Sequence, residues 1–350
     1  MAKTDPVITF IPKIMQLCTI LLGGISVING NVTYGIFVAF IQYSNNIVWP
    51  MENMGWLTNA MASGIASYKK INKILKEEPE IKNDENMICP DRMKGNLKFD
   101  NVCYEMNDTK ILKDISFELP KGRTLGIMGA TGSGKSTIVN LIGRFYDVTS
   151  GGIFMDDVDI RKLPLDMVRG NSSVVTQDVF LFSDTIKENV RLGARKVMTE
   201  ERVKSALVAS HSSEFVDKLS DGYNTVIGER GVGLSGGQKQ RISIARAIAK
   251  EANILILDDS TSALDMETEQ EIQKELFKHK DMSKIIIAHR ISSVRDADEI
   301  IILKDGEIAE RGTHNELLRA KGLYYSTYEA QYGDYHKALE VIGEEELICR

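Results

Sequence analysis

The chain has 350 residues and a formal net charge of −6, with 43% hydrophobic and 26% charged residues. This length allows one large domain or two smaller ones, and the composition is that of a globular protein. The acidic balance gives no support for a nucleic-acid partner, which usually requires a basic face. The four cysteines are scattered, so neither a disulfide framework nor a zinc site is expected, and a reducing compartment fits.

The N-terminal region is predicted to cross a lipid bilayer twice. Residues 10–65 carry only two charged side chains, whereas the sequence beyond Lys69 is richly charged. Ile14–Ile28 and Val32–Pro50, separated by a polar turn, each approach the roughly 20 residues that span a membrane. A pair of buried core helices, or a signal peptide, would give a similar pattern. The prediction is a partial transmembrane domain at residues 1–75.

Charged and polar residues orient this hairpin. Lysines at 69, 70, 73 and 76 place the C-terminal end of the second span in the cytoplasm by the positive-inside rule. Polar side chains inside that span are costly in lipid, so we expect them to face protein or a water-lined cavity. They are Gln42, Ser44, Asn45 and Asn46.

The remainder of the chain is predicted to be an α/β domain behind a linker. Residues 76–96 are charged and contain proline and glycine, which is typical of a linker. Short apolar strands then alternate with helical patterns over residues 97–335, which favours a largely parallel sheet. The predicted strands are 96–106, 124–129, 172–177, 253–258, 284–289 and 299–303. Residues 336–350 have the pattern of a charged surface helix or a frayed tail.

The segment GIMGATGSGKST, residues 126–137, has the spacing of a phosphate-binding loop between a strand and a helix. Its glycines, Gly129 and Gly134 among them, let backbone N–H groups surround phosphate oxygens at the positive end of the helix. Lys135 would reach the β- and γ-phosphates, and the Ser136 hydroxyl would bind Mg²⁺. A purely structural turn is the alternative. The further expected ATP contacts are Thr131, Gly132, Ser133 and Thr137.

A second glycine-rich helix start occurs at LSGGQKQR, Leu234–Arg241. Such a stretch is often only a turn, but the Ser235 hydroxyl and exposed N–H groups at a helix N-terminus also form an anion site. Two phosphate-binding helix ends in one chain are explained if two domains sandwich nucleotide, with each helix end serving a different ATP.

These motifs, in this order, resemble those of an ATP-binding cassette (ABC) transporter subunit of the exporter type. The resemblance covers about Leu97 to Tyr332, and the two N-terminal spans resemble the last two membrane helices of an exporter. It implies a cassette with a parallel core sheet, an antiparallel β-subdomain and a helical subdomain. Further matching segments are Gln177 in VVTQD, GERG at 228–231, Asp258–Asp259, SALD at 262–265 and His289 in IIIAHR.

The resemblance also implies a role for each matching residue. Asp258 would hold Mg²⁺ through water, and Gln177 would sense the metal and the attacking water. His289 would contact the γ-phosphate, although a histidine at a strand end is often only a core residue. Tyr104 would stack on adenine, with a half-buried strand aromatic as the alternative. The expected contacts to the nucleotide across the cassette pair are Ser235, Gly236, Gly237, Gln238 and Asp265.

The residue at the catalytic base position departs from the family pattern. A glutamate usually follows the Mg²⁺-binding aspartate there, whereas this chain has Asp259, whose side chain is one methylene shorter. Because misplacing a catalytic group by about 1 Å can cost about 10²-fold in rate, we expect slow hydrolysis with ATP binding retained. Alternatively, a small backbone shift lets Asp259 serve as the base.

An intact signature beside an aspartate base resembles one half of a heterodimeric multidrug-type exporter. Residues 129–137 with Asp259 would form the slow site, and residues 235–238 would complete a fast site on a partner subunit that carries glutamate. Since His289 is retained, the site is expected to be slow rather than dead. A homodimer with two slow sites is the alternative.

The expected protein is therefore a multi-pass cell-membrane subunit with its ATP-binding domain in the cytoplasm, using ATP and Mg²⁺ to export a substrate that the sequence does not identify. Exporter subunits have more membrane helices than this chain can form, so it resembles the C-terminal portion of a longer subunit. A soluble ABC ATPase of DNA repair or ribosomes is disfavoured, because the chain lacks a long coiled coil and a second cassette. A regulatory, non-transporting ATP-binding protein is the third hypothesis.

Overall fold

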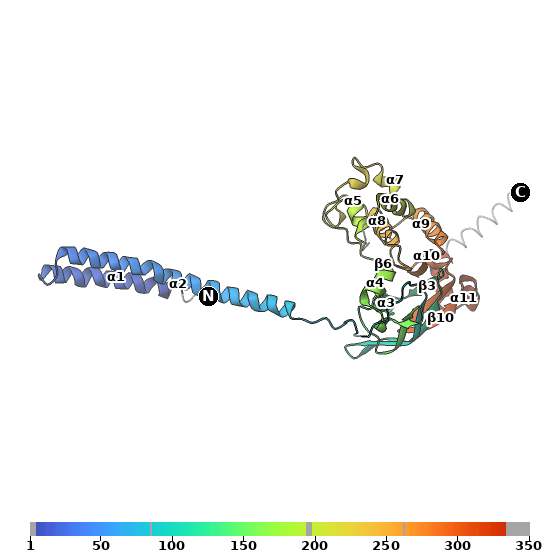
Figure 1. The fold of residues 1–350 in the computed structure, drawn as a ribbon, viewed down its shortest axis with the longest axis horizontal. Coiled ribbons are helices and arrows are strands. Elements are labelled where there is room, and N and C mark those ends of the chain that lie inside the picture. Colours follow the sequence, from blue (N-terminus) through green and yellow to red (C-terminus); the bar gives the residue numbers. More distant parts are fainter. Residues whose placement is uncertain (1–4, 85, 194–197, 262, 334–350) are drawn as a thin grey trace. The chain divides into compact units, whose positions relative to one another are not determined.

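The computed structural model describes residues 5–84, 86–193, 198–261 and 263–333. The chain divides after Glu80 into two compact units. The first is helical, and the second contains the strands found among these described residues (Figure 1). The predicted tail at 336–350 lies outside the described residues.

The first unit is an antiparallel pair of helices, α1 (Asp5–Ile28) and α2 (Tyr34–Leu75). They approach closely at Gly23, where an added Cβ would lie 2.5 Å from the Phe37 ring. The Gln16 amide donates a hydrogen bond to the Asn45 side chain across the pair. Of the four polar residues expected to face protein or a cavity, Ser44 is buried, whereas Gln42, Asn45 and Asn46 are exposed.

The second helix is longer than the predicted span of Val32–Pro50, because it continues through Pro50 to Leu75. A proline inside a helix removes one backbone hydrogen bond and kinks the helix without necessarily ending it. With 42 residues and a rise of 1.5 Å per residue, α2 is about 63 Å long. That length is about twice the roughly 30 Å of a bilayer's hydrocarbon core.

Only one helix among the described residues is long and apolar enough to cross a membrane by length and composition, namely Phe10–Ile28 in α1. Its side chains are mostly exposed, with 6% of the segment buried. The polar residues Gln42, Asn45 and Asn46 lower the hydropathy of α2. Of the two predicted spans, the first therefore meets the criteria of length and composition for crossing a membrane, and the second does not.

The second unit is built on a six-stranded sheet with strand order β10-β9-β3-β8-β7-β6. Its strands are β3 (Thr124–Gly129), β6 (Ser172–Val175), β7 (Ile254–Asp258), β8 (Ser283–Ile287), β9 (Glu299–Lys304) and β10 (Glu307–Gly312). All neighbours are parallel except β9 and β10. The prediction of a largely parallel sheet is thereby confirmed.

A smaller antiparallel sheet has the order β2-β1-β4-β5. Its strands are β1 (Leu97–Met106), β2 (Thr109–Leu119), β4 (Ser150–Met155) and β5 (Val158–Asp159). The stacked rings of Phe99 and Phe117, 4.4 Å apart, join the two longest strands. Both rings belong to one hydrophobic cluster with Ile127 and Leu141, so the two sheets share a core.

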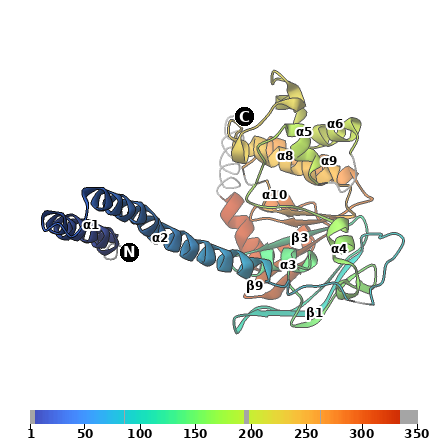
Figure 2. The same ribbon diagram turned by 60° about the vertical axis from the view of Figure 1, so that its left-hand side comes forward.

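Helices cover the large sheet and form a separate lobe (Figure 2). Around the sheet lie α3 (Lys135–Ile142), α4 (Leu165–Asn171), α9 (Met266–Lys278), α10 (Ile291–Val294) and α11 (His314–Ala320). The lobe consists of α5 (Ile186–Arg191), α6 (Glu200–Ala209), α7 (Ser213–Val216) and α8 (Gly236–Ala249). Short 3₁₀ helices lie at Ile160–Lys162, Gly222–Asn224 and Glu229–Gly231.

Candidate nucleotide-binding site

Four loops that the sequence singled out leave the same edge of the large sheet. Strands β3, β8, β7 and β6 are consecutive parallel neighbours, so their carboxyl ends lie together. Gly129 ends β3 and Asp258 ends β7, while His289 and Gln177 each follow the end of their strand by two residues. Strand pairing thus brings together residues that are far apart in the sequence.

The phosphate loop requires glycine at two positions. At Gly129, an added Cβ would lie 2.4 Å from the carbonyl oxygen of Leu303, which belongs to neighbouring β9. Gly134, the N-cap of α3, has φ +102°, and its Cβ would approach the Leu112 side chain within 2.5 Å. Both the close approach and the left-handed backbone exclude larger residues.

Lys135 lies inside this loop. Its side chain is buried, and the ammonium donates to the carbonyls of Gly129 (2.7 Å) and Ala130 (2.9 Å). Burial lowers the pKa of Lys135, while the nearby charges of Asp258 and Asp259 raise it. The ammonium is therefore held between the loop and the acidic strand end.

The remaining loop residues present polar groups toward solvent. Thr131, Gly132 and Ser136 are exposed and Thr137 is half-buried. The Ser133 hydroxyl is buried and has no hydrogen-bond partner within the described residues. An orphaned buried hydroxyl at the N-terminal end of α3 fits a site that receives phosphate oxygens.

Asp258 is half-buried where β7 ends. Burial and the charge of Asp259 raise the pKa of Asp258, while Lys135 and His289 lower it. A divalent cation beside Asp258 would favour the ionised carboxylate. The predicted metal residues, Ser136, Asp258 and Gln177, offer hydroxyl, carboxylate and amide oxygens, and oxygen ligands suit Mg²⁺.

Asp259 has a left-handed backbone, with φ +45°. Its N–H donates to the carbonyl of Ile287 at 2.8 Å, which continues the β7–β8 ladder by one residue. Asp and Asn tolerate this conformation better than other residues with a Cβ. This backbone feature gives no signal in the sequence.

His289 is exposed beside the phosphate loop, and its backbone is held by a residue that the sequence did not indicate. Gln331 donates to the His289 carbonyl at 2.7 Å and accepts from the Ile291 N–H at 3.0 Å. His289 and the loop line a cavity of about 660 Å³. Leu303 and Thr327 also line this cavity.

Tyr104, the predicted adenine platform, is buried in β1 with 7% of its surface exposed. Its ring centroid lies 5.6 Å from that of Tyr146, at a tilt of 36°. Tyr146 follows α3 and is 41% exposed. Tyr146, which the sequence analysis did not single out, is therefore more accessible than Tyr104.

The signature residues form a capping box at the start of α8. The Ser235 hydroxyl accepts from the Gln238 N–H at 3.2 Å, and the Gln238 side chain accepts from the Ser235 N–H at 2.9 Å. Ser235 and Gly236 are exposed, and an added Cβ at Gly237 would lie 3.1 Å from the Ala263 carbonyl oxygen. Within the described part of the chain, no hydrogen bond or ion pair joins this helix end to the phosphate loop.

Asp265 has a structural role of its own as the N-cap of α9. Its two carboxylate oxygens accept from the N–H and the hydroxyl of Thr268, each at 2.9 Å. These bonds lower the pKa of Asp265. Ser262, the first residue of the SALD motif, lies outside the described residues.

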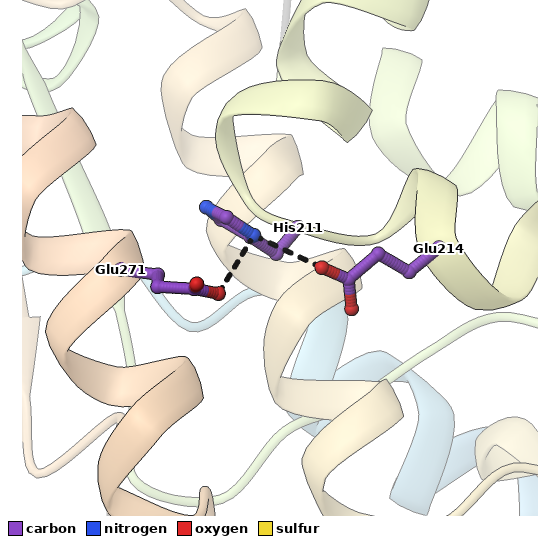
Figure 3. Close-up of side chains that lie close together, drawn as sticks. All are labelled: His211, Glu214 and Glu271. Carbon is purple, nitrogen blue, oxygen red and sulfur yellow. Dashed lines mark hydrogen bonds and ion pairs between the residues drawn. The ribbon is translucent and has the colours of Figure 1, made fainter.

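A second charged cluster lies away from these loops, at the helical lobe (Figure 3). His211 Nδ1 is 3.2 Å from Glu214 Oε1 and 3.3 Å from Glu271 Oε2. Arg241 donates to the other oxygen of Glu214 at 3.0 Å. Because a guanidinium already occupies this carboxylate, we interpret the cluster as an ion-pair network that joins the lobe to α9.

The fold and the strand-end loops define the class of protein: a phosphate-loop nucleotide-binding domain with an added helical lobe. Residues 112–262 match the family model described as ABC transporter. The chain therefore carries an ABC transporter ATP-binding domain. The resemblance found in the sequence is confirmed at this level.

Curated relatives and a solved structure agree. The chain is 39% identical over 335 residues to the uncharacterized ABC transporter ATP-binding protein YwjA of Bacillus subtilis (strain 168), covering 95% of this chain and 58% of the relative. It is 37% identical over 333 residues to the ATP-dependent lipid A-core flippase of Aliivibrio fischeri (strain ATCC 700601 / ES114), covering 94% and 57%. A bacterial Atm1-family ABC exporter with ATP bound matches with a TM-score of 0.76 and 33% identity, covering 93% of this chain and 58% of that one. The chain thus spans less than two thirds of the length of these relatives.

Proposed function

We propose that this chain is the ATP-binding and ATP-hydrolysing part of an ABC exporter subunit that drives substrate efflux across a membrane. The observation that carries this proposal is the convergence of the phosphate loop, Asp258–Asp259, His289 and Gln177 at one sheet edge. An apolar, exposed α1 in the same chain supports a membrane location. The similarity to a lipid flippase and an Atm1-family exporter points the same way.

Each residue of the site has a separate role in binding and hydrolysing ATP. Loop N–H groups from Gly129 to Thr137 bind the phosphates, and Lys135 exchanges its two carbonyl acceptors for phosphate oxygens. Ser136, Asp258 and Gln177 would hold Mg²⁺, which neutralises charge on the transferred phosphoryl group. His289 donates to the γ-phosphate, and the Tyr104–Tyr146 pair carries the adenine.

Asp259 orients the attacking water, and ATP hydrolysis at this site proceeds at a reduced rate. Its carboxylate is one methylene shorter than a glutamate, and its left-handed backbone fixes the direction of the side chain. A base set back from the γ-phosphate loses rate while the binding contacts remain. The site formed by residues 129–137 with Asp259 is therefore the slow one.

The exposed signature serves the nucleotide of a second subunit. Ser235 and Gly236 face solvent at the N-terminus of a 14-residue helix, where an anion is favoured. We favour a heterodimer, in which residues 235–238 and Asp265 complete a fast site on a partner that carries glutamate. A homodimer with two slow sites is the second arrangement.

Reconstitution tests the proposed function. The full chain, alone and with candidate partner subunits, is placed in vesicles that contain a panel of lipophilic dyes and labelled lipids. An exporter is supported if a probe moves across the vesicle membrane when ATP is added and this movement is lost in Lys135→Ala. If ATP binds and is hydrolysed without movement of any probe, the regulatory, non-transporting reading replaces it.

The signature role needs its own variant. Ser235→Ala should reduce hydrolysis at the partner's site while leaving ATP binding to residues 129–137 intact. The matched control is Ser220→Ala, another exposed serine of the helical lobe. An equal loss in both variants would contradict the assignment.

A further inference from the structure

A buried carboxylate lies behind the sheet edge and takes no part in the proposed chemistry. Glu269, in the first turn of α9, is 1% exposed. A buried carboxylate is costly unless hydrogen bonds or ion pairs compensate it. The partners of Glu269 therefore indicate what it does.

One oxygen of Glu269 connects two of the strand-end loops. Oε1 accepts from the Thr261 hydroxyl at 2.8 Å and from the Ser293 hydroxyl. Thr261 is two residues beyond Asp259, and Ser293 is four residues beyond His289. Gln273, one turn further along α9, adds a longer bond at 3.4 Å.

The other oxygen faces Arg290, the residue next to His289. Arg290 Nη1 lies 3.6 Å from Glu269 Oε2 and 3.5 Å from the carbonyl oxygen of Leu264. Leu264 belongs to the segment between the acidic strand end and α9. Both oxygens of one carboxylate thus contact the segment that carries His289, and Oε1 also contacts the segment that carries Asp259.

These two segments leave the sheet just after the last backbone bonds of their strands, from the Asp259 N–H to Ile287 and from the Ala288 N–H to Ile127. The bond from the Asp259 N–H to Ile287 is the last ladder contact between β7 and β8. Beyond these backbone bonds, the side chain of Gln331 contacts the His289 carbonyl, and Glu269 contacts both segments through Thr261 and Ser293. An error of about 1 Å in a catalytic group can cost about 10²-fold in rate.

We propose that Glu269 is a positioning residue, which fixes Asp259 and His289 relative to each other through Thr261, Ser293 and Arg290. It touches neither the nucleotide nor the attacking water. The inference rests on the proposed ATP hydrolysis, because the two residues that it positions are assigned there. It predicts that kcat depends on Glu269 while ATP affinity does not.

The test uses the full chain with its partner in detergent or vesicles. Glu269→Leu removes both acceptor oxygens, Glu269→Gln keeps the volume and one of them, and Thr261→Val removes a single bond. Glu267→Gln, an exposed glutamate in the same helical turn, is the matched control. For each variant we would measure kcat, KM, the Kd for ATP and the thermal unfolding midpoint.

We expect Glu269→Leu to lower kcat by about 10²-fold with less than a threefold change in Kd. Glu269→Gln should recover most of this loss, and Thr261→Val should fall between them. A parallel change in kcat and Kd, or equal losses for Gln and Leu, would overturn the positioning role. If Glu269→Leu does not fold, Thr261→Val and Glu269→Gln still decide the question.

Hydrogen exchange separates this inference from the proposed function. Peptides covering residues 259–265 and 288–294 should exchange faster in Glu269→Leu than in the wild type or Glu267→Gln. A wild type without ATPase activity would refute the proposed function, yet the exchange result would still report on the connection. Unchanged exchange in both segments would refute the connection itself.

Discussion

Lengthening the side chain at position 259 by one methylene, as in Asp259→Glu, is expected to raise ATP hydrolysis at this chain's own phosphate loop. Asp259 is half-buried and follows Asp258, the residue proposed to hold Mg²⁺. Its N–H remains tied to Ile287, so the substitution moves the carboxylate and leaves the start of the loop in place.

The magnitude follows from two opposing effects. A gain of about 10²-fold from bringing the base about 1 Å closer corresponds to about 2.7 kcal/mol of transition-state stabilisation. Against this, φ at position 259 is +45°, and a left-handed backbone costs most residues about 1–2 kcal/mol. If glutamate bears that cost in full, about 0.7–1.7 kcal/mol of the gain remains, so we expect a net increase in kcat of about 3- to 20-fold.

The assay is steady-state ATPase activity of the full chain beside Asp259→Glu and Asp259→Asn, with the Kd for ATP measured for all three. We expect similar Kd values, a faster glutamate variant and an asparagine variant slower than the wild type. A wild type that already hydrolyses ATP as fast as Asp259→Glu would refute the slow-site reasoning. The chain would then be better described as a self-sufficient homodimeric motor.

Three further outcomes are expected. Lys135→Ala removes a charged hydrogen-bond donor worth about 1.5–3 kcal/mol. A fluorescent-nucleotide titration should therefore show ATP affinity at least about tenfold weaker than in the wild type. Affinity within twofold of the wild type would contradict a contact between Lys135 and the phosphates. Gly129→Ala places a Cβ 2.4 Å from the Leu303 carbonyl oxygen, and overpacking of this kind costs about 1–3 kcal/mol of stability. Denaturant unfolding would measure this loss. The control is Gly170→Ala, whose Cβ meets open space. Burial lowers the pKa of His314 below its ordinary value of 6.5. Below that pH the unfolded chain binds more protons than the folded chain, so the free energy of unfolding falls as the pH drops toward the lowered pKa. Between pH 7 and 5 the free energy of unfolding should therefore depend less on pH in His314→Gln than in the wild type, and an equal dependence would contradict this cause.

The local motifs could be predicted from the sequence because their chemistry depends on short spacings. The phosphate loop, the signature and the acidic strand end each need particular residues at fixed offsets, and they were found at residues 129–137, 235–238 and 258–259. The strands of the parallel sheet were also predicted, since each is a short apolar run. Strands β2, β4, β5 and β10 were missed. The sequence of β2, TKILKDISFEL, mixes charged and apolar residues.

Contacts between distant residues could not be predicted. The left-handed backbone of Asp259, the hold of Gln331 on His289 and the burial of Glu269 all depend on which strands become neighbours. The length of α2 was also missed, because a proline and a polar cluster resemble a helix end when read locally. For Asp259, Gln331 and Glu269, tertiary packing decides what the local sequence does not indicate.

Helix α8 belongs to two hydrophobic cores at once. Ile244 and Ala247 pack in the cluster of the large sheet, whereas Ile242 and Ala245 pack in the cluster of the helical lobe. The signature residue Ser235 caps this same helix. If Ser235 contacts a partner's nucleotide as proposed, any displacement of this helix would act on both cores, because its residues pack in each.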